Sequence, residues 1–178
     1  CERAGLHLYD VIKTPVHGNS YVFVVSATQS RPQHIHNLKQ LENELYTPDI
    51  YSVWANRAKQ IAHEYDKAIT ELQDQGYTAI GYGAAAKGNT FLNYVETTLD
   101  AIVDDNELKQ NTYSPGKDIG VISMDDLLEN SGLTEKHKVV FVPLAWNVYN
   151  EIKFKIRLRR NESNDKFIRY FPEVIVES

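Results

Sequence analysis

Residues 77–94 read YTAIGYGAAAKGNTFLNY, and this stretch decides the fold. A short apolar run leads into a turn of glycine and alanine, and the turn continues into a helical pattern. In α/β folds such a strand–turn–helix unit binds phosphate, because a turn without bulky side chains lets the ligand approach the backbone closely. The first-turn amides and the helix dipole also favour negative charge. The stretch therefore predicts an α/β fold with a candidate anion-binding loop.

The same stretch fits a loose dinucleotide pattern. The pattern is Gly81-x-Gly83-x-x-Ala86, and Asp104 follows at the expected distance of about 20 residues. A free-standing NAD-binding oxidoreductase domain is therefore one hypothesis. A tight turn that only packs a helix onto a sheet is the other. A P-loop is excluded, because Lys87 precedes Gly88 whereas the P-loop lysine must follow its glycine.

Strand and helix patterns alternate beyond residue 76. Helices are expected at 90–96, after Ser123 (with Asp126 completing a capping box) and at 148–158. The expected strands are 79–82, 99–103, 119–122, 138–144 and 174–176. This alternation predicts a Rossmann-like, mostly parallel sheet with helices on both faces.

The region before residue 76 has a different organisation. Residues 6–13 and 20–27 are rich in β-branched and aromatic side chains and predict an antiparallel hairpin. Residues 30–37 are interpreted as a linker, followed by a short helix carrying Leu38, Leu41 and Leu45. A long helix is expected from Pro48, capped by Thr47, to the stop at Gly76. The predicted organisation is a hairpin (1–28), a linker with a short helix (29–47) and a Rossmann-like domain (48–178).

Composition narrows the class of protein. The chain has 178 residues and a net charge of −5, which gives no general attraction to nucleic acid or to an anionic membrane. A single cysteine cannot build a disulfide framework, so a cytoplasmic location is expected. No run is apolar enough to span a bilayer. Because the sequence opens on Cys1 within a strand pattern, we expect a piece of a longer polypeptide.

Candidate binding residues follow the predicted strands. In an open parallel sheet the ligand crevice lies beyond the carboxyl ends of the strands, where residues 83–90, 104–106 and 145–147 are expected. Lys87 would act as a point charge for a phosphate, and Asp104 would accept from a sugar hydroxyl. The turn 113–117 would close over the site. Trp146 and Asn147 have an equally simple alternative as a core aromatic and a helix cap.

Catalytic and metal-binding candidates are poor. Cys1 has no base nearby in sequence, and no nucleophile elbow is present. His34 and His36 lack a supporting cluster of ligands, so a solvated pair in the linker is the simpler interpretation. We therefore expect no catalytic residue and no metal ligand in this chain.

Four motifs in order carry a family resemblance. They are VHGNS (16–20), GAAAKGNTFLNY (83–94), VDDN with KQ and SPG (103–116), and LAWN with EI (144–152). Together they resemble the C-terminal domain of SAM-dependent C-methyltransferases acting on nucleotide-linked deoxysugars. In the first motif Asn19 stands where the family has a second glycine.

The resemblance implies a substrate-binding portion without chemistry of its own. S-adenosylmethionine would bind an upstream methyltransferase domain, whose sheet would end in the hairpin of residues 1–28. The substrate would be a nucleotide-linked sugar or a similar phosphate-bearing molecule. The implied substrate-binding residues are His17, Ser20, Gly83, Ala84, Lys87, Gly88, Asn89, Asp104, Pro115, Gly116, Trp146 and Asn147. A purely structural or oligomerisation domain remains an alternative.

Overall fold

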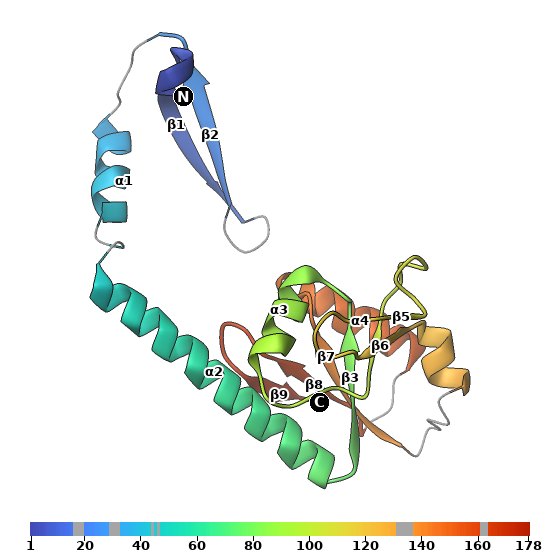
Figure 1. Cartoon of the computed structure of the whole chain (residues 1–178). Coiled ribbons are helices and arrows are strands. Elements are labelled where there is room, and N and C mark those ends of the chain that lie inside the picture. The colour runs from blue at the N-terminus through green and yellow to red at the C-terminus, as the bar shows by residue number, and fades with distance from the viewer. Residues whose placement is uncertain (16–19, 29–32, 44, 46, 131–136, 161–163) are drawn as a thin grey trace. The chain divides into compact units, whose positions relative to one another are not determined.

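The computed structural model describes residues 1–15, 20–28, 33–43, 45, 47–130, 137–160 and 164–178 (Figure 1). The chain forms two compact units, Cys1–Arg57 and Ala58–Ser178, and the division falls within the long helix α2 (Pro48–Asp74). No helix of the described ranges is long and apolar enough to cross a membrane.

The first unit contains the predicted hairpin. A 3-10 turn, η1 (Glu2–Ala4), precedes β1 (His7–Thr14), which pairs antiparallel with β2 (Ser20–Ser26). The following helix α1 (Gln33–Asn43) begins earlier than expected. The linker prediction was therefore wrong for residues 33–37. The apolar stripe starts at the buried Ile35, three residues before Leu38, and burial of Ile35 extends the helix toward its N-terminus.

The second unit is built on a seven-stranded sheet of order β5-β6-β4-β3-β7-β8-β9. The five inner strands are parallel and the two edge strands, β5 and β9, are antiparallel, which confirms the predicted fold class. The strands are β3 (Tyr77–Tyr82), β4 (Ala101–Val103), β5 (Thr112–Tyr113), β6 (Gly120–Ile122), β7 (Lys138–Pro143), β8 (Lys166–Arg169) and β9 (Ile175–Glu177). Strands β5 and β8 were not predicted, because both are short and mix polar with apolar residues.

Helices cover both faces of this sheet (Figure 1). The C-terminal part of α2 and the helix α3 (Ala86–Tyr94) pack on one face, where Val140 and Val142 of β7 point. The helix α4 (Tyr149–Arg159) and the π-helical segment η3 (Asp126–Asn130) pack on the other, against Val139 and Phe141. This alternation along β7 is the period-two pattern of a strand buried on both faces.

The predicted helix N-caps are present, but helix α3, like α1, begins earlier than predicted. Thr47 caps α2 through the Ile50 amide (3.4 Å), and Ser123 and Asp126 form the expected capping box. Helix α3, however, begins at Ala86 rather than at Thr90. The amide of Asn89 donates to the Ala85 carbonyl (2.9 Å), so the alanine-rich turn already forms the first helical turn. Alanine has the highest helix propensity, which explains the earlier start.

The amino edge of the sheet is held by a buried ion pair. Arg160, directly after α4, donates from Nε to Asp165 Oδ2 at 2.8 Å and from Nη2 to the His137 carbonyl at 2.7 Å. The Arg160 and Asp165 side chains are 5% and 0% exposed. The pair therefore joins the end of α4 to the beginnings of β7 and β8.

The carboxyl edge of the sheet is the opposite end. The chain passes from β3 through α3 to β4 on one side of β3, and later returns to β7 on the other side. Strand order thus reverses between β3 and β7, and ligands of open α/β sheets bind at such a switch point. The residues after β3, β4 and β7 meet there, as the sequence predicted.

Candidate functional site

Helix α3 begins at the switch point without a capping side chain. Gly83 has a φ of +88°, a conformation that favours glycine, and its amide donates to the Val103 carbonyl at 2.7 Å. Ala85 occupies the N-cap position and makes no side-chain hydrogen bond. The first-turn amides of α3 and the positive end of its dipole are therefore available to an anion.

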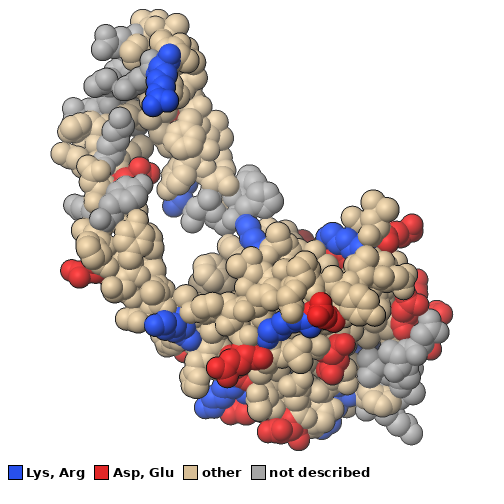
Figure 2. Space-filling model, in the orientation of Figure 1, with Lys and Arg blue, Asp and Glu red and all other residues tan. Residues whose placement is uncertain are grey.

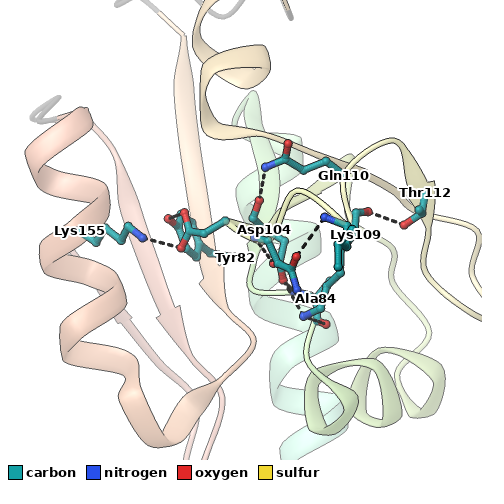
Figure 3. Close-up of polar contacts among 10 residues, drawn as sticks. Tyr82, Ala84, Asp104, Lys109, Gln110, Thr112 and Lys155 are labelled. Carbon is teal, nitrogen blue, oxygen red and sulfur yellow. Dashed lines mark hydrogen bonds and ion pairs between the residues drawn. The ribbon is translucent and has the colours of Figure 1, made fainter.

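Asp104 ties the loop after β3 to the loop after β4 (Figure 3). Its Oδ2 accepts from the Ala84 amide at 2.6 Å and from Lys109 Nζ at 3.1 Å, and its Oδ1 accepts from the Asn106 amide at 2.8 Å. Lys109 Nζ also donates to the Ala84 carbonyl at 2.9 Å. Asp104 is 7% exposed. This ring of contacts, which we call the Asp104 clamp, fixes the backbone just before α3.

The neighbouring carboxylate, Asp105, bonds to different partners. It accepts from the Tyr82 hydroxyl at 2.9 Å and from Lys155 Nζ of α4 at 2.6 Å (Figure 3). Burial, together with the hydrogen bond to Asp105, raises the pKa of Tyr82 above its ordinary value. Tyr82 therefore stays protonated at neutral pH and acts as a donor to Asp105. The two adjacent aspartates tie the end of β4 to β3, Lys109 and α4.

A cavity of about 440 Å³, here named the inner cavity, lies beside the start of α3. It is lined by residues 84–86 and by side chains from α3, β4, β6 and the 109–115 segment, including Asn89, Lys109, Ser114 and Pro115. The Oδ1 atom of Asn89 is buried and has no hydrogen-bond partner among the described residues. The volume lies within the range of about 300–1,000 Å³ that is typical of small-molecule sites.

A second, more open recess, here named the outer groove, also borders α3. Its volume is about 660 Å³, and it is lined by Lys87, Phe91, Tyr94, Trp146 and Tyr170 among others. Lys87 Nζ lies 5.5 Å from the centre of the Trp146 ring, within cation–π range. Asn89 and Thr90 line both recesses. The two recesses therefore share part of the first turns of α3 as a common wall.

The turn 113–117 is anchored to α3. Asn93 Nδ2 donates to the carbonyls of Asn89 and Pro115, both at 2.9 Å. Lys117 Nζ donates to the carbonyl of Val95 at 2.7 Å and also to those of Glu96 and Thr97. Gly116 has a φ of +93°, and a Cβ there would collide with the Asn93 side chain. The turn thus forms a fixed wall of the inner cavity in this structure.

The structure brings most of the predicted site residues together. The start of α3 is surrounded by Gly83, Ala84, Lys87, Asn89, Asp104, Pro115 and Trp146, and Gly116 follows Pro115 in the turn. Asn147 lies in the 3-10 turn η4 (Trp146–Val148) and does not line either recess. Ser20 begins β2 in the other unit, and His17 lies outside the described residues. Within the described ranges no cluster of three metal-ligating side chains occurs.

Two glycines of the stretch serve packing. A Cβ at Gly81 would meet Leu99 Cδ1 at 2.9 Å, and a Cβ at Gly88 would meet Leu144 Cβ at 2.5 Å. Gly88 therefore lets α3 approach the end of β7. This contact does not test the prediction that Gly88 binds substrate. It shows that packing against Leu144 by itself requires glycine at this position.

Replacing Gly88 with alanine should destabilise the fold, because the added Cβ would meet the Cβ and backbone of Leu144, which are not the free end of a flexible side chain. We expect a loss of about 1–3 kcal/mol in the free energy of unfolding, as for other overpacked cores. Urea denaturation followed by circular dichroism measures it. Gly120→Ala is the matched control, since its added Cβ would meet only Tyr113, at 4.0 Å. Equal stability of the two variants would contradict the packing role.

Sequence reasoning missed two residues of the site. Lys109 was noted only within the resembling Lys-Gln motif, although it completes the Asp104 clamp. Tyr170 lines the outer groove, stacks on Phe91 with ring centres 4.0 Å apart and donates to the Leu144 carbonyl at 2.7 Å. No local sequence pattern predicts this role for Tyr170, because its contact with Phe91 of α3 exists only once the sheet has formed.

A known protein family matches most of the chain. The family model of the C-methyltransferase C-terminal domain matches residues 15–172, which covers most of both units. No curated protein matches the chain. Because this family model matches nearly the whole length of the chain, the chain belongs to the C-methyltransferase C-terminal domain family.

Proposed function

We propose that this chain is the substrate-binding portion of a SAM-dependent C-methyltransferase and that it holds a nucleotide-linked sugar at the start of α3. The observation that carries the proposal is the pair of recesses on a shared wall of Asn89 and Thr90, beside the uncapped start of α3. A nucleotide-linked sugar has two bulky ends joined by a diphosphate. Two recesses beside an anion-favouring helix start match that shape and charge.

Two cations support the phosphate assignment. Lys87 lines the outer groove and Lys109 lines the inner cavity, so one ammonium group borders each recess. Direct acceptance from a sugar hydroxyl by Asp104 remains a prediction, since its oxygens already accept three hydrogen bonds from protein donors.

The methyl donor would be S-adenosylmethionine, bound by an upstream methyltransferase domain. The hairpin supports such a partner, because its strand β2 exposes Tyr21, Val22, Phe23 and Val25, with Phe23 64% exposed. A two-stranded hairpin is marginal alone and gains stability by packing on further strands.

No nucleic-acid partner is proposed: the net charge is −5, and acidic and basic side chains are interspersed on the face of the second unit in Figure 2. The single cysteine favours the cytoplasm.

An NAD-binding oxidoreductase domain is the weaker candidate. In dinucleotide folds the acidic residue after the second strand accepts from the ribose. Here Asp104 is 7% exposed and holds Ala84, Asn106 and Lys109 instead. The Asp104 carboxylate is therefore not placed as the ribose acceptor of a dinucleotide-binding fold. Quenching of NADH fluorescence together with a thermal shift on adding NAD would revive the candidate.

Calorimetry with a panel of nucleoside diphosphate sugars tests the proposal, and Lys87→Ala separates binding from a purely structural role. A charge-assisted contact contributes about 1.5–3 kcal/mol, and an exposed lysine lies at the low end, so we expect about tenfold weaker binding at unchanged melting temperature. Lys67→Ala is the matched control, because it removes another exposed lysine charge, on α2. If Lys87→Ala bound like Lys67→Ala, the structural reading would be favoured.

A further inference from the structure

We propose that the inner cavity takes the nucleoside end of the substrate and the outer groove takes the sugar, with Lys109 contacting the phosphate between them. This orientation rests on the proposed function. It goes further by assigning each recess to one part of the ligand, and it adds Lys109 to the substrate-binding residues.

The inner cavity suits a flat, weakly polar group. It is the more enclosed of the two recesses, and its lining includes the buried Leu92, Ile102, Val121 and Leu144. A sugar carries several hydroxyls, and each would lose water in such surroundings without a partner. A nucleobase instead has two apolar faces and a few polar atoms on its edge. The apolar lining therefore favours the base.

The polar atoms of the inner cavity match a base edge. Asn89 Oδ1 is a buried acceptor without a donor among the described residues, and such an atom is costly to leave unpaired. The N–H groups of a nucleobase edge are donors of the kind that Asn89 Oδ1 lacks. Asn89 lines the inner cavity, so a donor on the edge of a base bound there could satisfy this acceptor.

Lys109 is suited to contact the phosphate. Its ammonium group has three donors, of which two bond to Ala84 O at 2.9 Å and Asp104 Oδ2 at 3.1 Å. Its side chain is 43% exposed and lines the inner cavity. The third donor has no partner among the described residues. Because the Asp104 clamp holds the ammonium group, binding of a phosphate there needs little ordering of a long side chain.

The outer groove suits the sugar because the methylated carbon must stay accessible. The resemblance implies that the methyl donor is held by another domain, so the reacting end of the substrate has to face outward. The outer groove is open, and Tyr94 and Trp146 give it apolar surface for the carbon skeleton of a sugar. Lys87 in the same groove lies beside the start of α3, where it reaches the diphosphate from the sugar side.

Four probes and four variants of the full chain test the orientation. The probes are a nucleoside monophosphate, the corresponding diphosphate, its sugar conjugate and the free sugar 1-phosphate, each titrated by calorimetry. The nucleotide is chosen as the one that the unchanged chain binds most tightly among the uridine, thymidine, guanosine and adenosine series. Circular dichroism and melting temperature establish that each variant is folded.

Thr112→Trp adds bulk at an exposed position that lines the inner cavity. We expect it to weaken the diphosphate and the sugar conjugate alike, by tenfold or more, and to leave the sugar 1-phosphate unchanged. Lys109→Ala should weaken the diphosphate and the conjugate by about tenfold, while Lys109→Arg retains most of the affinity because it keeps the charge. Tyr94→Ala should reduce the affinity for the conjugate toward that of the diphosphate and leave the diphosphate unchanged.

Three results would overturn the orientation alone: unchanged diphosphate binding by Thr112→Trp, equal effects of the two Lys109 variants, or a loss of diphosphate affinity in Tyr94→Ala. In each of them the unchanged chain still binds the sugar conjugate, so the proposed function stands. If the unchanged chain binds none of the conjugates, the proposed function itself fails, and the orientation fails with it.

Discussion

Replacing Asp165 with alanine is expected to lower the free energy of unfolding by about 3–5 kcal/mol, the cost of removing one partner of a buried ion pair. Arg160 would keep its buried position but lose both hydrogen bonds to the carboxylate, at 2.8 Å and 3.2 Å. The Val139 amide would also lose its 3.3 Å contact to Asp165 Oδ1. The dominant cost is a buried guanidinium charge that has lost its carboxylate partner.

Urea denaturation at neutral pH measures this loss. Glu71→Ala is the control, because its partner Lys67 is 3.8 Å away and both side chains are more than half exposed. Such exposed pairs contribute about 0.3–0.5 kcal/mol. Asp165 lies at the amino edge of the sheet, opposite the candidate site. Under conditions in which it is folded, Asp165→Ala should therefore bind nucleotide-linked sugars like the unchanged chain. A loss no larger than that of Glu71→Ala would show that the ion pair does not hold this edge.

Replacing Asp104 with alanine should affect both stability and binding. The Ala84 and Asn106 amides would lose their acceptor, and Lys109 would keep only its bond to the Ala84 carbonyl. Breaking a fully buried pair costs about 3–5 kcal/mol, and the 43% exposure of Lys109 reduces this through solvent screening, so we expect about 2–3 kcal/mol. Without the Asp104 clamp the backbone before α3 is free to shift, and we expect substrate affinity to fall at least tenfold.

Asp104→Asn is the matched variant for this position. An amide keeps one acceptor oxygen and nearly the same shape, but it loses the charge opposite Lys109. We expect its stability and affinity to lie between those of the unchanged chain and Asp104→Ala. The comparison with Asp165→Ala is decisive, because both variants are destabilised while only the carboxyl-edge variant should lose affinity. Unchanged affinity in Asp104→Ala would separate the clamp from the binding site.

Much of the second unit could be predicted from the sequence. The continuous apolar run at 138–144 identified β7 as buried on both faces, and the glycine–alanine turn identified the junction of β3 and α3. The rule that ligands bind beyond the carboxyl ends of parallel strands then gathered residues 83–90, 104–106 and 145–147 at one edge. The first two predictions depend on local patterns, and the third needs only the parallel arrangement of the strands.

What could not be predicted depends on contacts between distant segments. The strand β8 has only two buried apolar residues, Phe167 and Ile168, between Lys166 and Arg169, so it carries little strand signal of its own and is defined by its pairing with β7 and β9. Whether the Asp104 carboxylate bonds to a ligand or to the protein depends on whether Lys109 approaches it. The sequence does not reveal the distance between these two side chains. The division of the site into an inner cavity and an outer groove depends likewise on Pro115 and Tyr170 reaching α3 from opposite sides.

Nuclear magnetic resonance of the 178-residue chain with a nucleoside diphosphate sugar tests the central claim most directly, because it detects weak binding and locates it. Backbone amide shifts are followed during titration. The account predicts saturable shifts for residues 84–90 and for Lys109 and Ser114, with little change near Asp165. Saturable shifts confined to the amino edge, or no shifts with any nucleotide-linked sugar, would contradict a substrate site at the start of α3.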